Sequence, residues 1–569
     1  MTAAEAGVGG PALVLGEAGT SPLPLVTVDG VPWGTGHALA DDPWLVPWQG
    51  LRWTDGSWFA DGLGGTAGTL ALVTDDADPA RSVTTFRGVK GRHESYMRGI
   101  DLLTAAAPWR VAFAFDEVLD NEAWNYREQP FATDGLVFPG HGKVRQSRTR
   151  LQRILDPENR LSVEFSTGRR TRNDAPAWDT GQLETWDTGV AVVMDGAAGR
   201  VRWQGMVHWR DRDVEWVDLS AAGDTLVEAR KLETAREGVA LVLRPRGGHG
   251  GPPPLAHLRL SYLQWSLADL ALGTRPGPPD LGPVDGRGRQ VRAEAGAGRR
   301  LGGQRATVTV AGTWDERISI APGWAVGLGE DTDRPRWRLE LAGDGRAPRS
   351  DELLTPYTRR VGARSVTILP NFDLERERTL RAGLVLQGRL LGTDLALDAA
   401  VRRLEDGIAW VAEPEGAGVG RWRNGLEMDS ARVTGRLERQ GRFLGWGRAQ
   451  VEGTWQGWDE RAGKASLLPP ERSGRLVLLW ENHWFREDGI LQLGLIGHWR
   501  GPMADPWDPS RLSELPARTV LDLLVGFRLV GAHLSLAFRN LSGERTQLST
   551  GTWSNGQEME MRLHWSFRH

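Results

Sequence analysis

Apolar and polar residues alternate with a period of two along much of this chain. The most regular example is the C-terminal segment 559–567, whose apolar positions are Met559, Met561, Leu563, Trp565 and Phe567. The residues between them are Glu560, Arg562, His564 and Ser566. Because successive side chains of a β-strand point to opposite faces, this pattern predicts a strand with one apolar face and one polar face.

The same alternation recurs from about residue 81 onward, without a comparable helical periodicity. It is clearest in segments 161–166, 201–210, 380–390, 448–455 and 491–500. The polar positions carry Arg, Glu, Gln and His as well as Ser and Thr. Segment 258–267 changes phase after Tyr262, which predicts a β-bulge. We therefore predict an all-β, antiparallel region of many strands of about ten residues.

The length of this region limits its architecture. The roughly 490 residues after position 80 make about 20–24 strands, at about 20–24 residues for each strand and its connection. A sheet of that size must close, split or repeat radially, and the sequence has no repeat of propeller type. We therefore predict one large transmembrane β-barrel over residues 81–569, with its apolar face toward lipid and its polar face toward a wet lumen. Pro- and Gly-rich segments 125–144, 243–256, 272–290 and 501–516 are predicted loops on the outer side of the membrane.

Composition narrows the function classes only partly. The formal net charge of −4 gives no general attraction to nucleic acid, and the absence of cysteine excludes disulfides and Cys-ligated metal sites. The chain has no apolar run long enough for a transmembrane helix. Its 27 Trp against 4 Tyr fit rings at a membrane interface, and equally sugar-stacking platforms or propeller cores.

The first residues show no signal peptide, because no basic region precedes an apolar core there. A secreted barrel needs one. We therefore expect either that a leader is encoded upstream of Met1 or that the secretion hypothesis fails.

Two separated regions carry a family resemblance. In residues 24–76, a "VDGVP" string at 28–32 is followed by a "GxGGxxGxLxLxT" string at 62–74, with Asp61 where a Tyr is usual. In residues 515–569, the strings 515–522 and 538–545 precede the alternating closing strand, and Arg568 and His569 follow Phe567. On these residues the chain resembles the TonB-dependent outer-membrane receptors: the first region is similar to the second half of their plug domain, and the second to their last strands.

The resemblance implies a barrel of about 22 strands with a small plug-like domain at residues 1–80. It implies residence in the outer membrane of a Gram-negative-type bacterium and contact with outer-membrane lipid. It also implies two protein partners, the barrel-assembly machinery and a TonB-type energy-transducing protein. The expected function is uptake of a bulky solute, such as a metal chelate, a cobalamin-like compound or an oligosaccharide, without a cofactor.

Candidate site residues follow from the same hypothesis. The N-terminal region contains five tryptophans that either pack the plug or contact a ligand: Trp33, Trp44, Trp48, Trp53 and Trp58. The strand parity predicts a set of lumen-facing residues: Arg202, His208, Arg210, Arg448, His498, Arg500, Arg562 and His564. The arginines favour anionic solutes, but glutamates interspersed at the same parity indicate that most are paired wall charges.

Catalytic signatures are absent: the sequence has no H-E-x-x-H, G-x-S-x-G or Walker P-loop string, so we predict no enzyme. The histidines are scattered, and we predict no metal site. The residues before position 20 are too few for the first half of a plug, and we find no TonB box in the sequence. Two alternatives therefore stay open, namely a passive or structural outer-membrane barrel without energy coupling, and a soluble Trp-rich glycan-binding β protein.

Overall fold

The computed structural model describes the strands of a large barrel and most of its short turns. The described residues are 25–28, 31–32, 50–54, 69–73, 82–91, 96–120, 142–173, 182–219, 226–246, 256–271, 284–316, 320–330, 336–346, 348, 357–361, 364–369, 371–412, 419–442, 446–462, 471–484, 489–504, 514–544, 547–549, 552–553 and 557–568. No helix in these residues is long and apolar enough to cross a membrane.

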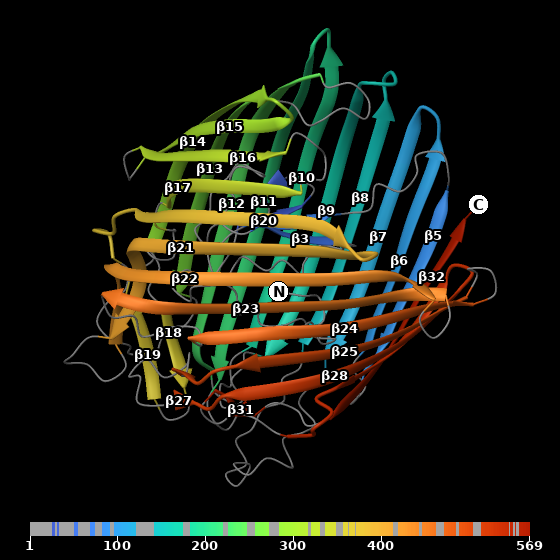
Figure 1. The fold of residues 1–569 in the computed structure, drawn as a ribbon. Helices are drawn as coiled ribbons and strands as arrows, with labels where there is room; N and C mark the ends of the chain where they lie inside the picture. Colours follow the sequence, from blue (N-terminus) through green and yellow to red (C-terminus); the bar gives the residue numbers. More distant parts are fainter. Residues whose placement is uncertain are drawn as a thin grey trace.

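The wall is a closed antiparallel barrel of 22 strands, which confirms the predicted fold class (Figure 1). Its first strands are β5 (Val83–Lys90), β6 (Tyr96–Ala106), β7 (Trp109–Asp120), β8 (Gly142–Ile154), β9 (Arg160–Asn173), β10 (Gln182–Ala198), β11 (Val201–Leu219), β12 (Leu226–Pro245), β13 (Ala256–Ala271), β14 (Val284–Leu301), β15 (Gln304–Asp315), β16 (Ala321–Glu330) and β17 (Trp337–Arg346). It continues with β20 (Glu377–Leu390), β21 (Thr393–Ala412), β22 (Val419–Arg442), β23 (Trp446–Ala462), β24 (Arg472–Trp484), β25 (Gly489–Arg500), β28 (Arg518–Leu529), β29 (Ala532–Arg539) and β32 (Glu558–Arg568).

The C-terminal strand closes the ring. β32 pairs with β29 on one side and with β5 on the other, so that Phe567 lies opposite Thr84 and Met561 opposite Lys90. The Phe567 ring packs at 4.4 Å from the Trp565 ring and at 6.0 Å from the Phe86 ring, centroid to centroid. The alternating segment at the chain's end is therefore the strand that joins the last hairpin to the first.

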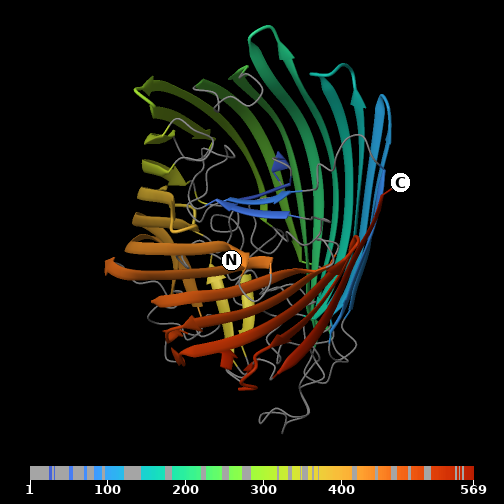
Figure 2. The same cartoon turned by 45° about the vertical axis from the view of Figure 1, so that its right-hand side comes forward.

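Smaller elements lie outside the wall. β1 (Leu25–Val28), β2 (Val31–Pro32), β3 (Gly50–Thr54) and β4 (Thr69–Val73) form a separate sheet, which lies inside the ring of wall strands (Figure 2). The hairpin of β18 (Tyr357–Val361) and β19 (Arg364–Leu369) pairs in parallel with the first residues of β22. Two further pairs are β26 (Met503–Ala504) with β27 (Glu514–Leu515), and β30 (Gln547–Ser549) with β31 (Thr552–Trp553).

The two ends of the barrel differ in their connections. At one end, most connections are short, with tight turns such as Gly199–Arg200, Gly302–Gly303 and Leu391–Gly392; at the other end most connections are longer. We call these the turn end and the loop end. In an outer-membrane barrel the short turns face the periplasm and the longer loops face outward.

Two sequence expectations are wrong. The connection within 243–256 lies at the turn end, because the Arg246 N–H donates to the Arg200 carbonyl at 2.7 Å, beside a two-residue turn.

Segment 258–267 contains no bulge, since β13 keeps one continuous register with both neighbours. Instead Leu263 is an apolar residue at an inward position, only 7% exposed. The phase change in the sequence therefore marks an apolar side chain that is buried on the inner face of the barrel wall.

Strand lengths also exceed the expected ten residues, since β22 has 24 residues and β12 and β21 have 20 each. About ten tilted residues suffice to cross the hydrocarbon core, so these strands project beyond it. At the loop end the projecting parts have a core of their own, formed by Leu404, Leu426 and Met428 with Trp458 packed against them. Register shifts near Gly407 bend β21 in this region.

The two C-terminal motif strings meet at the loop end. The Asn540 N–H donates to Asp522 Oδ1 at 2.7 Å, and the Asn540 side chain donates to the Glu544 carbonyl at 2.8 Å. Asn540 itself has a φ of 51°, a left-handed conformation that Asn tolerates better than most residues. The "NL" turn thus fixes the end of β29 to β28.

Candidate functional site: the inner wall of the barrel

The outer face of the wall is apolar and exposed around the whole ring. On β11 the outward residues Val207 and Trp209 are 55% and 42% exposed, whereas His208 between them is 5% exposed. On β32 the outward residues Met559, Met561, Leu563 and Trp565 are 40–54% exposed. Exposed apolar side chains of this extent fit contact with lipid. The polar residues consequently face the lumen, where a functional site must lie.

One part of the inner wall is covered. We call the inward-facing residues of β8–β12 the covered wall. Its buried polar and charged members are Gln146, Arg148, Ser162, Glu164, Ser166, Arg170, Thr185, Asp187, His208, Arg210, Arg212, Thr234 and Arg236. Charged groups are rarely buried unless paired, so their partners decide whether this arrangement is stable.

Asp187 is the central acceptor of the covered wall. Arg210 donates to both of its oxygens, from Nε at 2.7 Å and from Nη2 at 2.6 Å. Arg212 donates from Nε at 2.9 Å. The side chains of Asp187 and Arg212 are 0% exposed and that of Arg210 is 5% exposed. The register of β10 and β11 creates this group by placing Asp187 directly opposite Arg212 and next to Arg210.

Glu164 has the same role on the neighbouring strand, β9. Arg148 Nε donates to Glu164 Oε1 at 2.6 Å, and Arg150 Nη2 approaches Oε2 at 3.4 Å. Close by on β11, His208 faces Gly238, where an added Cβ would lie 2.5 Å from the His208 ring. Gly238 therefore leaves room for the imidazole between neighbouring strands.

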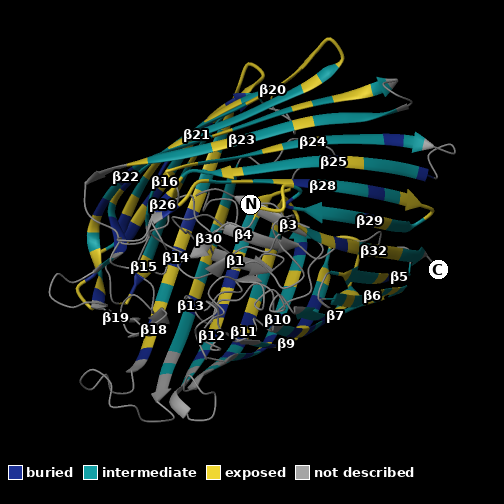
Figure 3. Ribbon diagram, turned by 90° about the horizontal axis from the view of Figure 1, so that it is seen from below, coloured by how far each residue is buried: buried dark blue, intermediate teal, exposed yellow. Residues whose placement is uncertain are grey.

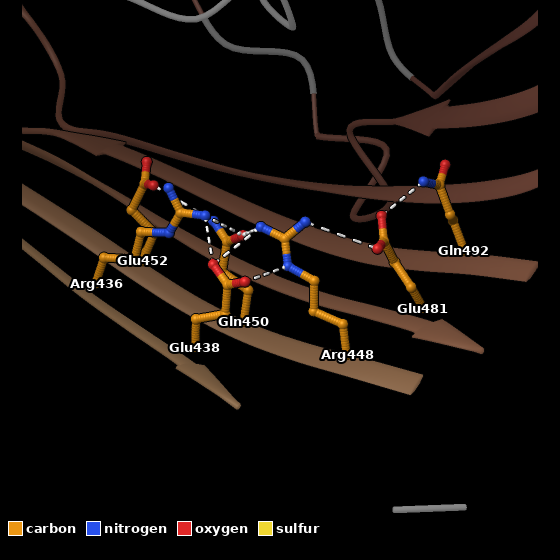
Figure 4. Close-up of polar contacts among 7 residues, drawn as sticks. All are labelled: Arg436, Glu438, Arg448, Gln450, Glu452, Glu481 and Gln492. Atoms are coloured by element: carbon orange, nitrogen blue, oxygen red, sulfur yellow. Dashed lines mark hydrogen bonds and ion pairs between the residues drawn. The ribbon is translucent and has the colours of Figure 1, made fainter. Parts of the chain in front are cut away.

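The opposite part of the inner wall is open. We call the inward-facing residues of β22–β25 between the two ends the open wall. Figure 4 shows its turn-end part, where Glu438 accepts from Arg436 at 2.6 Å and from Arg448 Nε at 2.8 Å. The row continues across β24 and β25, since Arg448 lies 3.8 Å from Glu481, and Gln492 donates to Glu481 at 2.7 Å. Guanidinium, carboxylate and amide groups thus alternate across four strands.

The side chains of the covered wall and of the open wall differ in how far they are exposed. The side chains of Arg436, Arg448 and Glu438 are 40%, 30% and 17% exposed. None of the buried polar or charged residues in the described part of the chain lies on β22 or β23. Most of the described residues of these two strands are intermediate or exposed (Figure 3). The open wall therefore offers donors and acceptors to water or to a hydrated solute, whereas those of the covered wall are enclosed.

The structure places the predicted residues as follows. Arg202 is exposed near the turn end of β11, and His208 and Arg210 lie in the covered wall. Arg448 is in the open wall, where His498 and Arg500 are partly buried on β25. On β32, Arg562 pairs with Glu560, and His564 is exposed. Trp33, Trp44, Trp48 and Trp58 lie outside the described residues, as does the side chain of Trp53.

Sequence reasoning missed the acceptors that organise both walls, above all Asp187, Glu438 and Glu481. Their inward parity was readable, but their partners depend on cross-strand register, which no local pattern specifies. Within the described ranges no group of three or more His, Asp or Glu side chains could hold a metal ion. The inner wall is thus a hydrogen-bonding surface without a metal centre among these residues.

Comparison with known proteins gives structural neighbours only. No family model matches the chain, and no curated protein is similar to it in sequence. Among solved structures, the ferric enterobactin receptor PfeA of Pseudomonas aeruginosa superposes with a TM-score of 0.71 at 14% identity, covering 96% of this chain and 91% of PfeA. The siderophore receptor PirA of Acinetobacter baumannii gives 0.72 at 11% identity, covering 95% and 90%. The copper transporter OprC gives 0.71 at 13% identity, also covering 95% and 90%.

These neighbours are TonB-dependent siderophore and copper receptors. Identities of 11–14% establish a common fold and leave the solute of this chain open. The chain has the fold of the TonB-dependent outer-membrane receptors.

Proposed function

We propose that this protein is an outer-membrane receptor that takes up a bulky solute through a plugged barrel. The observation that carries the proposal is a 22-strand barrel whose outer face is apolar and whose lumen contains a separate small sheet (Figure 2). A barrel of this size without a plug leaves a wide aqueous channel. A sheet inside the lumen fits a gated receptor better than a general porin.

The division into domains belongs to the same proposal. The wall begins at Val83, and the small sheet ends at Val73. This supports a plug-like domain at 1–80 and a barrel at 81–569. Transport through a plugged barrel needs a rearrangement of the plug, which an inner-membrane partner of the TonB type would power.

Metal chelates are the first solutes to test. PfeA and PirA are named as receptors for siderophores and OprC as a copper transporter. The mixed donors and acceptors of the open wall suit a polar chelate, and they suit an oligosaccharide or a cobalamin-like compound as well. Nothing on the described inner wall resembles a catalytic constellation, and we propose no enzymatic step.

Uptake in cells tests the function. The full chain, exported by a fused leader into a Gram-negative host without receptors of its own for these solutes, should import at least one of ferric enterobactin, copper(II) and cobalamin. Import should stop when a protonophore removes the proton-motive force. Import that continues in de-energised cells would favour the passive barrel, and import of none of the three would remove these solutes from the proposal.

A further inference from the structure

We propose that the solute path follows the open wall, along β22 and β23, rather than the middle of the lumen or the covered wall. This inference rests on the proposed function, because it assigns a place within the barrel to the uptake step. It is carried by the contrast in exposure between the covered wall and the β22–β23 part of the open wall, which are built from the same residue types.

The open wall contains an unbroken polar strip that runs along the barrel. The inward cross-strand pairs of β22 and β23 follow one another as Gln440–Arg448, Glu438–Gln450, Arg436–Glu452, Thr434–Thr454 and Arg432–Gln456. These pairs span residues 432–440 of β22, and about 9–11 tilted residues suffice for a strand to cross the hydrocarbon core. The strip therefore reaches across the membrane.

Side chains within the strip are linked to each other. The Thr434 and Thr454 hydroxyls lie 3.2 Å apart, and Gln450 donates to Glu452 at 3.4 Å. Arg448 also donates to Gln450 at 3.1 Å. Partly exposed side chains that satisfy one another can exchange a partner for a solute hydroxyl or carboxylate at a smaller cost than buried ones, because ion pairs in contact with water contribute little. Such a surface suits a polar solute that moves stepwise.

The covered wall cannot serve in the same way. The cross-strand pairs of β9 and β10 include Glu164–Ala191, Ser166–Gly189 and Arg170–Thr185. All six residues are buried, and Thr185 is only 2% exposed. Opening this side to a solute would also expose Asp187 and its two arginines. The covered wall is therefore closed to a solute.

Cysteine labelling tests the assignment on the full chain, which has no native cysteine. Thr454→Cys and Thr185→Cys are matched variants, since both replace an inward threonine of a neighbouring-strand pair. A charged, membrane-impermeant maleimide should react with Cys at position 454 at least about tenfold faster, because thiol reactivity follows access. Gln450→Cys and Ser166→Cys form a second pair with the same expectation. Equal rates in both pairs, or faster reaction on β9 and β10, would overturn the proposal.

A block of uptake then tests the path itself. A bulky maleimide adduct at Gln450→Cys should lower the initial rate of ferric enterobactin uptake about tenfold, because the adduct fills the strip. The same adduct at Glu544→Cys, on the exposed turn at the loop end, should leave the rate unchanged. Unchanged uptake with the adduct at position 450 would contradict the path. If the unmodified chain imports none of the probes, the proposed function fails for them, while the labelling rates still decide which wall is open.

Discussion

The covered and open walls use the same chemistry in different surroundings. In both, arginines on one strand pair with a carboxylate on the next. Around Asp187 the side chains are 0–5% exposed, whereas around Glu438 they are 17–40% exposed. The pattern of alternation along β10–β11 and β22–β23 does not reveal this difference. What occupies the lumen beside a strand decides whether its polar face acts as a packing surface or as a passage.

The largest effect is expected in the covered wall. Asp187→Ala leaves Arg210 and Arg212 buried without their carboxylate, and breaking a buried ion pair from one side costs about 3–5 kcal/mol. Urea unfolding of the purified protein in detergent micelles, followed by the loss of the fast-migrating folded band, measures the change in free energy. A cost below about 1 kcal/mol would mean that this wall is wet, as exposed pairs are.

A charge placed on the lipid face should have the next largest effect. Val433→Arg puts a guanidinium on the outer face of β22, and such a substitution near the bilayer midplane costs about 2–4 kcal/mol. Thr434→Arg is the matched control, one residue along and facing the open wall, and should cost much less. The same urea titration, performed in lipid vesicles, compares the two variants. Equal costs would contradict the assignment of faces.

The smallest effect is expected in the open wall. Glu438→Ala removes the acceptor of Arg436 and Arg448, whose side chains remain in contact with water. The stability should fall by less than about 1 kcal/mol, because exposed ion pairs contribute about that much or less. A loss as large as that of Asp187→Ala would erase the contrast between the two walls. The expected consequence is instead a changed rate of solute uptake, measured with the same probes.

The sequence predicts the part of the fold that the membrane imposes. Lipid demands an apolar outward face, so the parity of Val207 or Leu563 is readable from the alternation alone. The strand number follows from length, and closure follows from the need to avoid open edges. The prediction that segment 243–256 lies at the loop end is wrong. The end of the barrel at which a connection lies depends on the number of strands before it, and the sequence does not give that number.

The site is less predictable for a physical reason. Asp187 and Arg210 are 23 positions apart, and their contact depends on the turn between β10 and β11 and on the resulting register. Burial of the covered wall depends further on what lies inside the lumen, which leaves no trace in the wall strands themselves. The role of the five Trp residues of the N-terminal region, in plug packing or in ligand contact, stays a prediction.

The migration of the protein on a gel tests the central claim, a closed barrel embedded in the outer membrane. The full chain should fractionate with the outer membrane, require detergent for extraction, and migrate faster when unheated than after boiling, because a closed barrel stays folded in the gel. A protein that is soluble in plain buffer and migrates identically with and without heating would contradict the account.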